Sequence, residues 1–155
     1  MTQTTDPVTQ SVLVPLEPDA AFELFTDRFA EWWPKDSHHI RDSPAADAVL
    51  EPREGGRWYE RSESGDECDW GAVLEIDRPN RILLAWQLTP EWKFDPDRAN
   101  ATEVEVTFNA EENGTRVTLE HRGFEVHGEP GAAMRELVGG DGGWAQLMEL
   151  YKNAA

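Results

Sequence analysis

The chain has 155 residues, and its 31 acidic and 14 basic side chains give a formal net charge of -17 at pH 7. Such an acidic surface repels phosphate backbones and anionic lipids, so nucleic acid and membranes are disfavoured as partners. The single cysteine, Cys68, excludes an internal disulfide and a cysteine zinc cluster. No apolar run approaches the roughly 20 residues that span a bilayer, and no signal pattern opens the chain. These features favour a cytoplasmic protein with a disordered leader at 1–7 and one domain at 8–155.

A strand and a helix are expected first. Apolar and polar residues alternate over 8–16, which is typical of a strand with one buried face. Pro18 then opens a helical pattern that continues to Trp33 and ends at Pro34, because proline cannot continue a helix. Residues 35–46, which are rich in Pro, Ser and Asp, predict a loop.

Six further strands are expected because the apolar period then changes to two. They cover 49–53, 57–62, 67–77, 81–88, 101–110 and 115–122, with a long loop at 89–100. Gly55-Gly56 and Asn113-Gly114 are typical of tight turns, and such short connections join antiparallel neighbours. In the third of these strands, strict alternation places one set of side chains on a common face: Cys68, Trp70, Ala72, Leu74 and Ile76.

The C-terminal part is helical but interrupted. Helical spacing starts at Pro130, and the four glycines within 139–143 predict a bend or a split, since glycine is costly inside a helix. Asp141 can cap a new helix at Trp144. A sheet with one apolar face must bury that face against another element. The C-terminal segment is the long helix available to cover it.

Four segments together resemble a known family. They are 18–22 leading to 32–34, then 51–60, then 102–108, and finally 114–121 followed by Gly143-Trp144 and Leu147. In this order they are similar to the family named for activator of Hsp90 ATPase homologue 1, within the START-like superfamily, also called SRPBCC or Bet v 1-like. The resemblance implies an α+β helix-grip fold. In that fold a curved seven-stranded antiparallel sheet surrounds a C-terminal helix, two short helices follow strand 1, and a cavity between sheet and helix often takes an apolar small molecule.

The seven tryptophans carry most of the functional information. Converging indoles either fill a core or line a pocket in which their N–H groups orient a ligand, and aromatic residues also serve homodimer interfaces. Because adjacent helical residues point about 100° apart, one of Trp32 and Trp33 should pack and the other should rim an opening. The predicted ligand-binding residues are Trp32, Trp33, Trp58, Trp70, Trp86, Phe108, His121, Trp144, Leu147 and Met148.

Two residues are candidates for acid–base catalysis. His121 ends an inward-facing stripe, where it would shuttle a proton or bind a ligand carbonyl, or simply be a satisfied histidine at the edge of the core. Glu60 lies two residues after Trp58 in the same expected strand, so its side chain would point to the same side, toward the interior. The alternative for Glu60, and for Glu51, is an outward position or an ion pair with one of the nearby arginines, Arg53, Arg57 or Arg61.

Other site chemistries find little support. His38-His39 lies in a loop with aspartates, but adjacent histidines rarely bind one ion together, so neither a metal nor a cofactor is expected. Cys68 sits among apolar neighbours and is expected to be inert.

The leading interpretation is a binding module for an apolar or aromatic small molecule. A polyketide cyclase-like or hydrolase-like enzyme using the same cavity, and a protein-interaction module such as an Hsp90 ATPase stimulator, are the alternatives.

Overall fold

The computed structural model describes residues 5–35, 45–140 and 142–155. The elements in chain order are β1 (Val8–Val14), α1 (Pro18–Phe25), the 3-10 helix η1 (Phe29–Glu31), β2 (Ala45–Leu50), β3 (Arg57–Ser62), β4 (Glu67–Asp77), β5 (Arg81–Trp86), η2 (Arg98–Asn100), β6 (Thr102–Glu111), β7 (Gly114–Arg122), η3 (Phe124–His127), α2 (Glu129–Gly139) and α3 (Trp144–Ala154). The His38-His39 pair, the cap at Asp141 and part of the expected leader lie outside the described residues.

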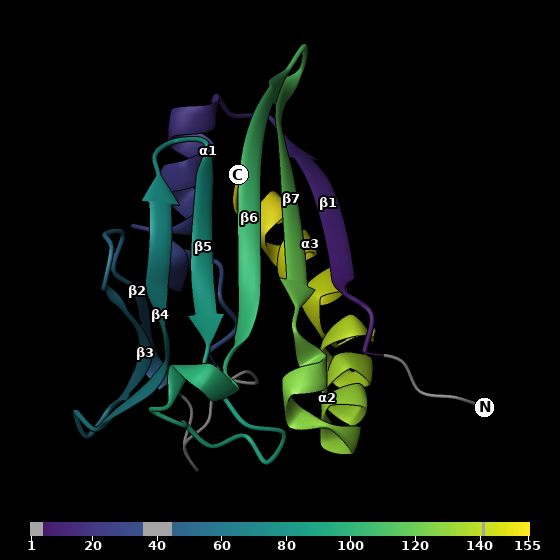
Figure 1. Ribbon diagram of the computed structural model, residues 1–155. Coiled ribbons are helices and arrows are strands. Elements are labelled where there is room, and N and C mark those ends of the chain that lie inside the picture. The colour runs from purple at the N-terminus through teal and green to yellow at the C-terminus, as the bar shows by residue number, and fades with distance from the viewer. Residues whose placement is uncertain (1–4, 36–44, 141) are drawn as a thin grey trace.

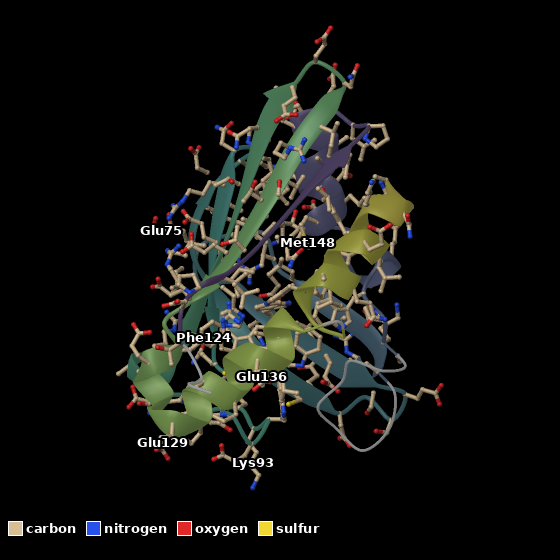
Figure 2. All side chains as sticks on the ribbon, turned by 90° about the vertical axis from the view of Figure 1, so that its right-hand side faces the viewer. Glu75, Lys93, Phe124, Glu129, Glu136 and Met148 are labelled. Atoms are coloured by element: carbon tan, nitrogen blue, oxygen red, sulfur yellow. The ribbon has the colours of Figure 1, made fainter. Side chains whose placement is uncertain are left out.

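One antiparallel sheet holds all seven strands, in the order β1-β7-β6-β5-β4-β3-β2 (Figure 1). Strands β2 to β7 each pair with their neighbour in sequence, and β1 returns to pair with β7, where Val12 lies opposite Val117. Figure 2 shows the sheet curving around α3, with α1 on the same concave side. The predicted α+β helix-grip fold is confirmed.

The helix expected over 18–33 is shorter than its pattern indicated. α1 ends at Phe25, and the hydroxyl of Thr26 donates to the carbonyl of Phe22 at 2.7 Å. A threonine that bonds back to the carbonyl four residues earlier offers the backbone an alternative to continued helix. The separate turn η1 then leads to Trp32 and Trp33, so two short helices follow β1 as the resemblance implied.

Two strand predictions need correction. β2 begins at Ala45 and ends at Leu50, instead of covering 49–53, and β5 ends at Trp86, two residues early. The single alternating face in β4 was also wrong, because the pairing register shifts between Trp58 and Tyr59 and again between Val73 and Glu75. Each shift adds a residue to β4 and reverses the side that the following residues face. The buried core cluster accordingly contains Val73 but neither Ala72 nor Leu74.

Charged residues line the convex face of the sheet. Arg81 pairs with Glu105 and with Glu75, and Arg122 pairs with Glu105 at 2.8 Å and with Glu103 at 3.2 Å. These side chains are partly exposed, and exposed pairs of this kind contribute about 0–1 kcal/mol each. Aromatic rings of the buried core cluster pack between the sheet and the helices, where Phe25 of α1 contacts Phe108 and Trp144 of α3 contacts Trp86.

The glycine run splits the C-terminal helix, as predicted. α2 ends at Gly139 and α3 begins at Trp144. At Gly143 an added Cβ would lie 2.1 Å from the carbonyl oxygen of Val138, so only glycine allows this tight corner. At the other end of α3 the hydroxyl of Tyr151 donates to the carbonyl of Ala21 at 2.7 Å, which fastens α3 to α1.

Candidate ligand-binding site

Five buried tryptophans form a closed cycle of ring contacts, which we call the tryptophan cycle. The centroid distances around it are 5.1 Å for Trp33–Trp70, 5.8 Å for Trp70–Trp58, 5.5 Å for Trp58–Trp86, 5.7 Å for Trp86–Trp144 and 6.4 Å for Trp144–Trp33. All five contacts are tilted or edge-on. Among the described residues, no ring contact joins two non-adjacent members, so the contacts run around the cycle and not across it.

Gly71 explains why two members of the cycle meet across a strand. Trp58 on β3 lies opposite Gly71 on β4, and Gly71 lies opposite Trp86 on β5. An added Cβ at Gly71 would lie 1.8 Å from the carbonyl oxygen of Ala85, so this close approach of β4 to β5 requires glycine. This role of Gly71 was not predicted from sequence, although an isolated glycine inside a strand is a recognised signal of a bulge or a close approach.

The indole N–H groups of the cycle differ in their partners. Trp70 Nε1 donates to Glu60 Oε1 at 2.9 Å, and Trp144 Nε1 donates to His121 Nδ1 at 2.9 Å. Trp58 Nε1 and Trp86 Nε1 are buried and have no hydrogen-bond partner among the described residues. A buried donor left unsatisfied costs about 1–3 kcal/mol. Two neighbouring members of the cycle therefore each hold a donor that an additional acceptor would satisfy.

His121 is a fixed, neutral imidazole. Its Nδ1 accepts from Trp144, so the ring proton sits on Nε2, which donates to the hydroxyl of Thr102 at 2.7 Å. Complete burial lowers the pKa of His121 from 6.5 to about 3. With both nitrogens engaged and the ring uncharged near neutral pH, the arrangement favours a satisfied core histidine over a proton shuttle.

Glu60 faces the interior. Its side chain is fully buried, and Trp70 donates to it from the neighbouring strand. The arginines considered as alternatives pair with other carboxylates: Arg57 contacts Asp69 at 2.5 Å, and Arg61 contacts Glu67 at 3.1 Å. Glu60 is thus the buried carboxylate beside the tryptophan cycle.

Glu51 and Cys68 lie apart from this interior. Glu51 accepts the backbone N–H of Arg57 at 2.7 Å and pairs with Arg53 at 3.2 Å, which matches the ion-pair alternative. Cys68 is partly exposed, and its thiol lies 3.7 Å from the carbonyl of Asp69. Within the described part of the chain, no group of three or more His, Cys, Asp or Glu residues could hold a metal ion.

Two residues predicted for the site lie next to α1 instead. Trp32 donates its indole N–H to the carbonyl of Leu24 at 3.0 Å and packs on Tyr151. Phe108 packs on Phe22 and Phe25, with centroid distances of 5.0 Å and 6.0 Å. Of the adjacent pair it is therefore Trp33 that joins the cycle, while Trp32 packs between α1 and α3.

Further side chains complete the surroundings of the cycle. Leu147 and Met148 are buried on α3, and Met148 lies between that helix and the sheet (Figure 2). Phe29, which was not assigned to the site from sequence, contacts Trp33 at 4.9 Å and also touches Trp58 and Trp70. Its position on the apolar stripe of the expected first helix was the signal that could have indicated it.

The family model of the activator of Hsp90 ATPase homolog 1-like proteins matches residues 15–152. The chain belongs to this family. Membership confirms the resemblance found in the four sequence segments. No helix among the described residues of this AHSA1-like chain is long and apolar enough to cross a membrane. No curated protein sequence matches it.

Solved structures place this AHSA1-like chain among related folds. It is 34% identical to an anthrahydroquino-gamma-pyrone synthase, Txn09, complexed with SUM, covering 100% of both chains with a TM-score of 0.69. It is 32% identical to CalC, a self-sacrificing resistance protein from Micromonospora echinospora, covering 96% of this chain and 93% of CalC with a TM-score of 0.68. An AHSA1-like protein from Aeromonas hydrophila, 19% identical over 96% of this chain and 90% of its own, shares the fold with a TM-score of 0.62.

Proposed function

We propose that this protein binds a flat, apolar small molecule between the concave face of the sheet and α3. The observation that carries the proposal is the tryptophan cycle. Its five members come from β3, β4, β5, α3 and the segment after η1, and all are at least 94% buried, since Trp33, the most exposed, has a relative exposure of 6%. Side chains from so many elements converge around one centre, where a planar ligand would meet several ring edges and faces at once.

Hydrogen bonding argues for a ligand over a core that serves stability alone. Buried polar groups in folded proteins are nearly always paired, so each exception calls for an explanation. Two neighbouring exceptions, Trp58 and Trp86, lie in the same cycle. The two relatives above 30% identity give further support, because one is a synthase of a polycyclic aromatic compound and the other is a resistance protein.

The first test is a thermal-shift screen with flavonoids, aromatic polyketides and fatty acids. A ligand at 100 times its Kd stabilises by about 2.7 kcal/mol, which in a domain of this size raises Tm by roughly 5–10 °C. We expect planar aromatic compounds to produce such shifts and fatty acids to produce smaller ones. A screen in which no aromatic compound raises Tm would remove the proposal.

A pair of variants locates the binding site. Trp33→Leu removes one wall of the cycle and should abolish the shift, while Phe108→Leu truncates a buried aromatic away from the cycle and should keep it. Both substitutions lower the starting Tm, so the ligand-induced increment is the quantity to compare. Equal increments in the two variants would place the ligand elsewhere.

A second candidate is an enzyme that uses the same interior. It is favoured by the 34% identity to a synthase over the whole chain and by the inward-facing carboxylate of Glu60. Glu60→Gln keeps an acceptor for Trp70 but cannot exchange a proton, so turnover of a bound aromatic substrate should collapse while binding persists. Unchanged turnover in this variant would exclude Glu60 as the acid–base group.

A further inference from the structure

We infer that the ligand of the tryptophan cycle is a neutral aromatic carbonyl compound whose oxygen accepts the N–H groups of Trp58 and Trp86. The inference rests on the proposed function and specifies the chemical class of its ligand. It draws on three features of the interior: its unpaired polar groups are donors, the charge around it is negative, and its walls are flat aromatic rings.

The unpaired groups are both donors. Trp58 and Trp86 sit on β3 and β5, on either side of Gly71, and their ring centroids are 5.5 Å apart. Tryptophan N–H can only donate, so the ligand must supply an acceptor, and a pure hydrocarbon would leave both donors unsatisfied. A carbonyl oxygen has two lone pairs and can accept from two donors that flank it.

The charge of the described residues around the cycle disfavours an anionic acceptor. Among the described residues, no lysine or arginine is buried. Among the described residues, Glu60 and His121 are the ionisable side chains that hydrogen-bond to indoles of the cycle, and His121 is bonded as a neutral ring. A carboxylate or phosphate taken out of water here would find no buried lysine or arginine among the described residues, and the strongly negative charge of the whole protein would disfavour it.

The walls favour a flat ligand over a flexible one. The cycle consists of rigid indoles in tilted and edge-on contact, to which Phe29 adds another ring. Planar rings match such walls and lose little conformational freedom on binding, whereas an acyl chain loses rotamer entropy at each bond. The ligand must therefore accept hydrogen bonds, carry no charge and be planar. An aryl ketone or a quinone meets these three requirements.

Three matched tricyclic compounds test this class: fluorene, 9-fluorenone and 9-fluorenone-2-carboxylate. We expect 9-fluorenone to bind about tenfold more tightly than fluorene, the combined effect of two modest hydrogen bonds, and the carboxylate to bind more weakly than 9-fluorenone. Affinities come from titrations followed by ¹H–¹⁵N correlation spectra of the ¹⁵N-indole-labelled protein. With 9-fluorenone the indole N–H signals of Trp58 and Trp86 should shift further than those of the other tryptophans. With fluorene these two signals should shift no more than the others.

Variants that keep an aromatic ring but delete a donor complete the test. Trp58→Phe and Trp86→Phe should each reduce the preference for 9-fluorenone over fluorene several-fold, whereas Trp70→Phe, whose N–H is already bonded to Glu60, should keep it. If a variant does not fold, the spectra of the unmodified protein still test the inference, because they show which indole N–H signals shift with each compound. Equal affinity for fluorene and 9-fluorenone, or tighter binding of the carboxylate, would overturn this inference alone. If none of the three binds, this inference also fails, and the proposed function falls with it when the thermal-shift screen finds no aromatic ligand either.

Discussion

His121 joins three elements through its two ring nitrogens. From β7 it reaches Thr102 at the start of β6 and Trp144 at the start of α3. The pKa lowered by burial keeps this ring neutral in the folded protein, while in the unfolded chain it takes up a proton below about pH 6.5. Its burial therefore makes folding depend on pH, beginning at pH values where most carboxylates are still ionised.

The sign of this dependence follows from proton binding. Between pH 6.5 and about 3 the unfolded chain binds the His121 proton and the folded protein does not, so acidification favours unfolding. Lowering the pH from about 7.5 to about 5 should reduce the free energy of unfolding by about 2 kcal/mol. Urea denaturation at the two pH values, in about 0.5 M NaCl to screen surface charge, measures the change.

Two histidine variants control this measurement. His121→Gln keeps an acceptor for Trp144 and a donor for Thr102 but does not titrate, so most of the pH dependence should vanish. His127 is less buried, and burial also lowers its pKa, so His127→Gln should remove only a smaller part. A folded protein equally stable at both pH values would show that His121 is protonated in the native state.

At the scale of elements, the corner between α2 and α3 positions Trp144 in the cycle. The backbone N–H of Gly143 donates to the carbonyl of Gly140 at 3.0 Å, and its own carbonyl accepts from Leu147 at 3.1 Å. The packing of Gly143 against Val138 leaves no space for a side chain. The direction of α3, and with it the place of the Trp144 indole over the sheet, therefore depends on this glycine.

Adjacent glycines in the same corner give a matched prediction. Gly143→Ala must displace the start of α3 and should destabilise the protein by about 1–3 kcal/mol, the usual cost of overpacking. Gly142→Ala would place its Cβ 3.8 Å from the side chain of Gln146, an ordinary contact, and should change stability little. Chemical denaturation compares the two. Equal effects would show that the corner relaxes without strain.

At the scale of the whole molecule, negative charge dominates the surface. The net charge of -17 is spread over 155 residues, and the Arg–carboxylate pairs of the convex face neutralise only part of it. Self-repulsion of this kind destabilises a compact state and is weakened by salt. The surface therefore favours solubility at some cost in stability at low ionic strength.

Salt should stabilise the fold. Raising NaCl from about 0.02 M to about 0.5 M shortens the screening length several-fold, and we expect Tm at neutral pH to rise by several degrees as repulsion falls. Near pH 4.5, where part of the carboxylates are protonated, the same addition should have a smaller effect. A Tm that falls with added NaCl would show that the surface ion pairs outweigh the repulsion.

Local signals in the sequence were enough for most of the fold. Alternation and tight turns such as Asn113-Gly114 predicted six consecutive antiparallel strands because neighbouring strands pair over short distances in sequence. The glycine run predicted the split between α2 and α3 because its cost in a helix is local. The early end of α1 at Phe25 was missed, since the competing hydrogen bond of Thr26 looks no different in sequence from a helical threonine.

The pattern of residue types was sufficient to predict the sheet, the covering helix, the acidic surface and an aromatic interior. Which indoles meet depends on tertiary packing, because two register shifts in β4 set the sides on which Trp70 and Val73 lie. Tertiary packing also decided that Trp70 and Trp144 have polar partners while Trp58 and Trp86 do not. These partners lie on other elements, 10 residues away for Trp70 and 23 for Trp144, and whether two such groups come within hydrogen-bond distance depends on backbone positions that no pattern of residue types records.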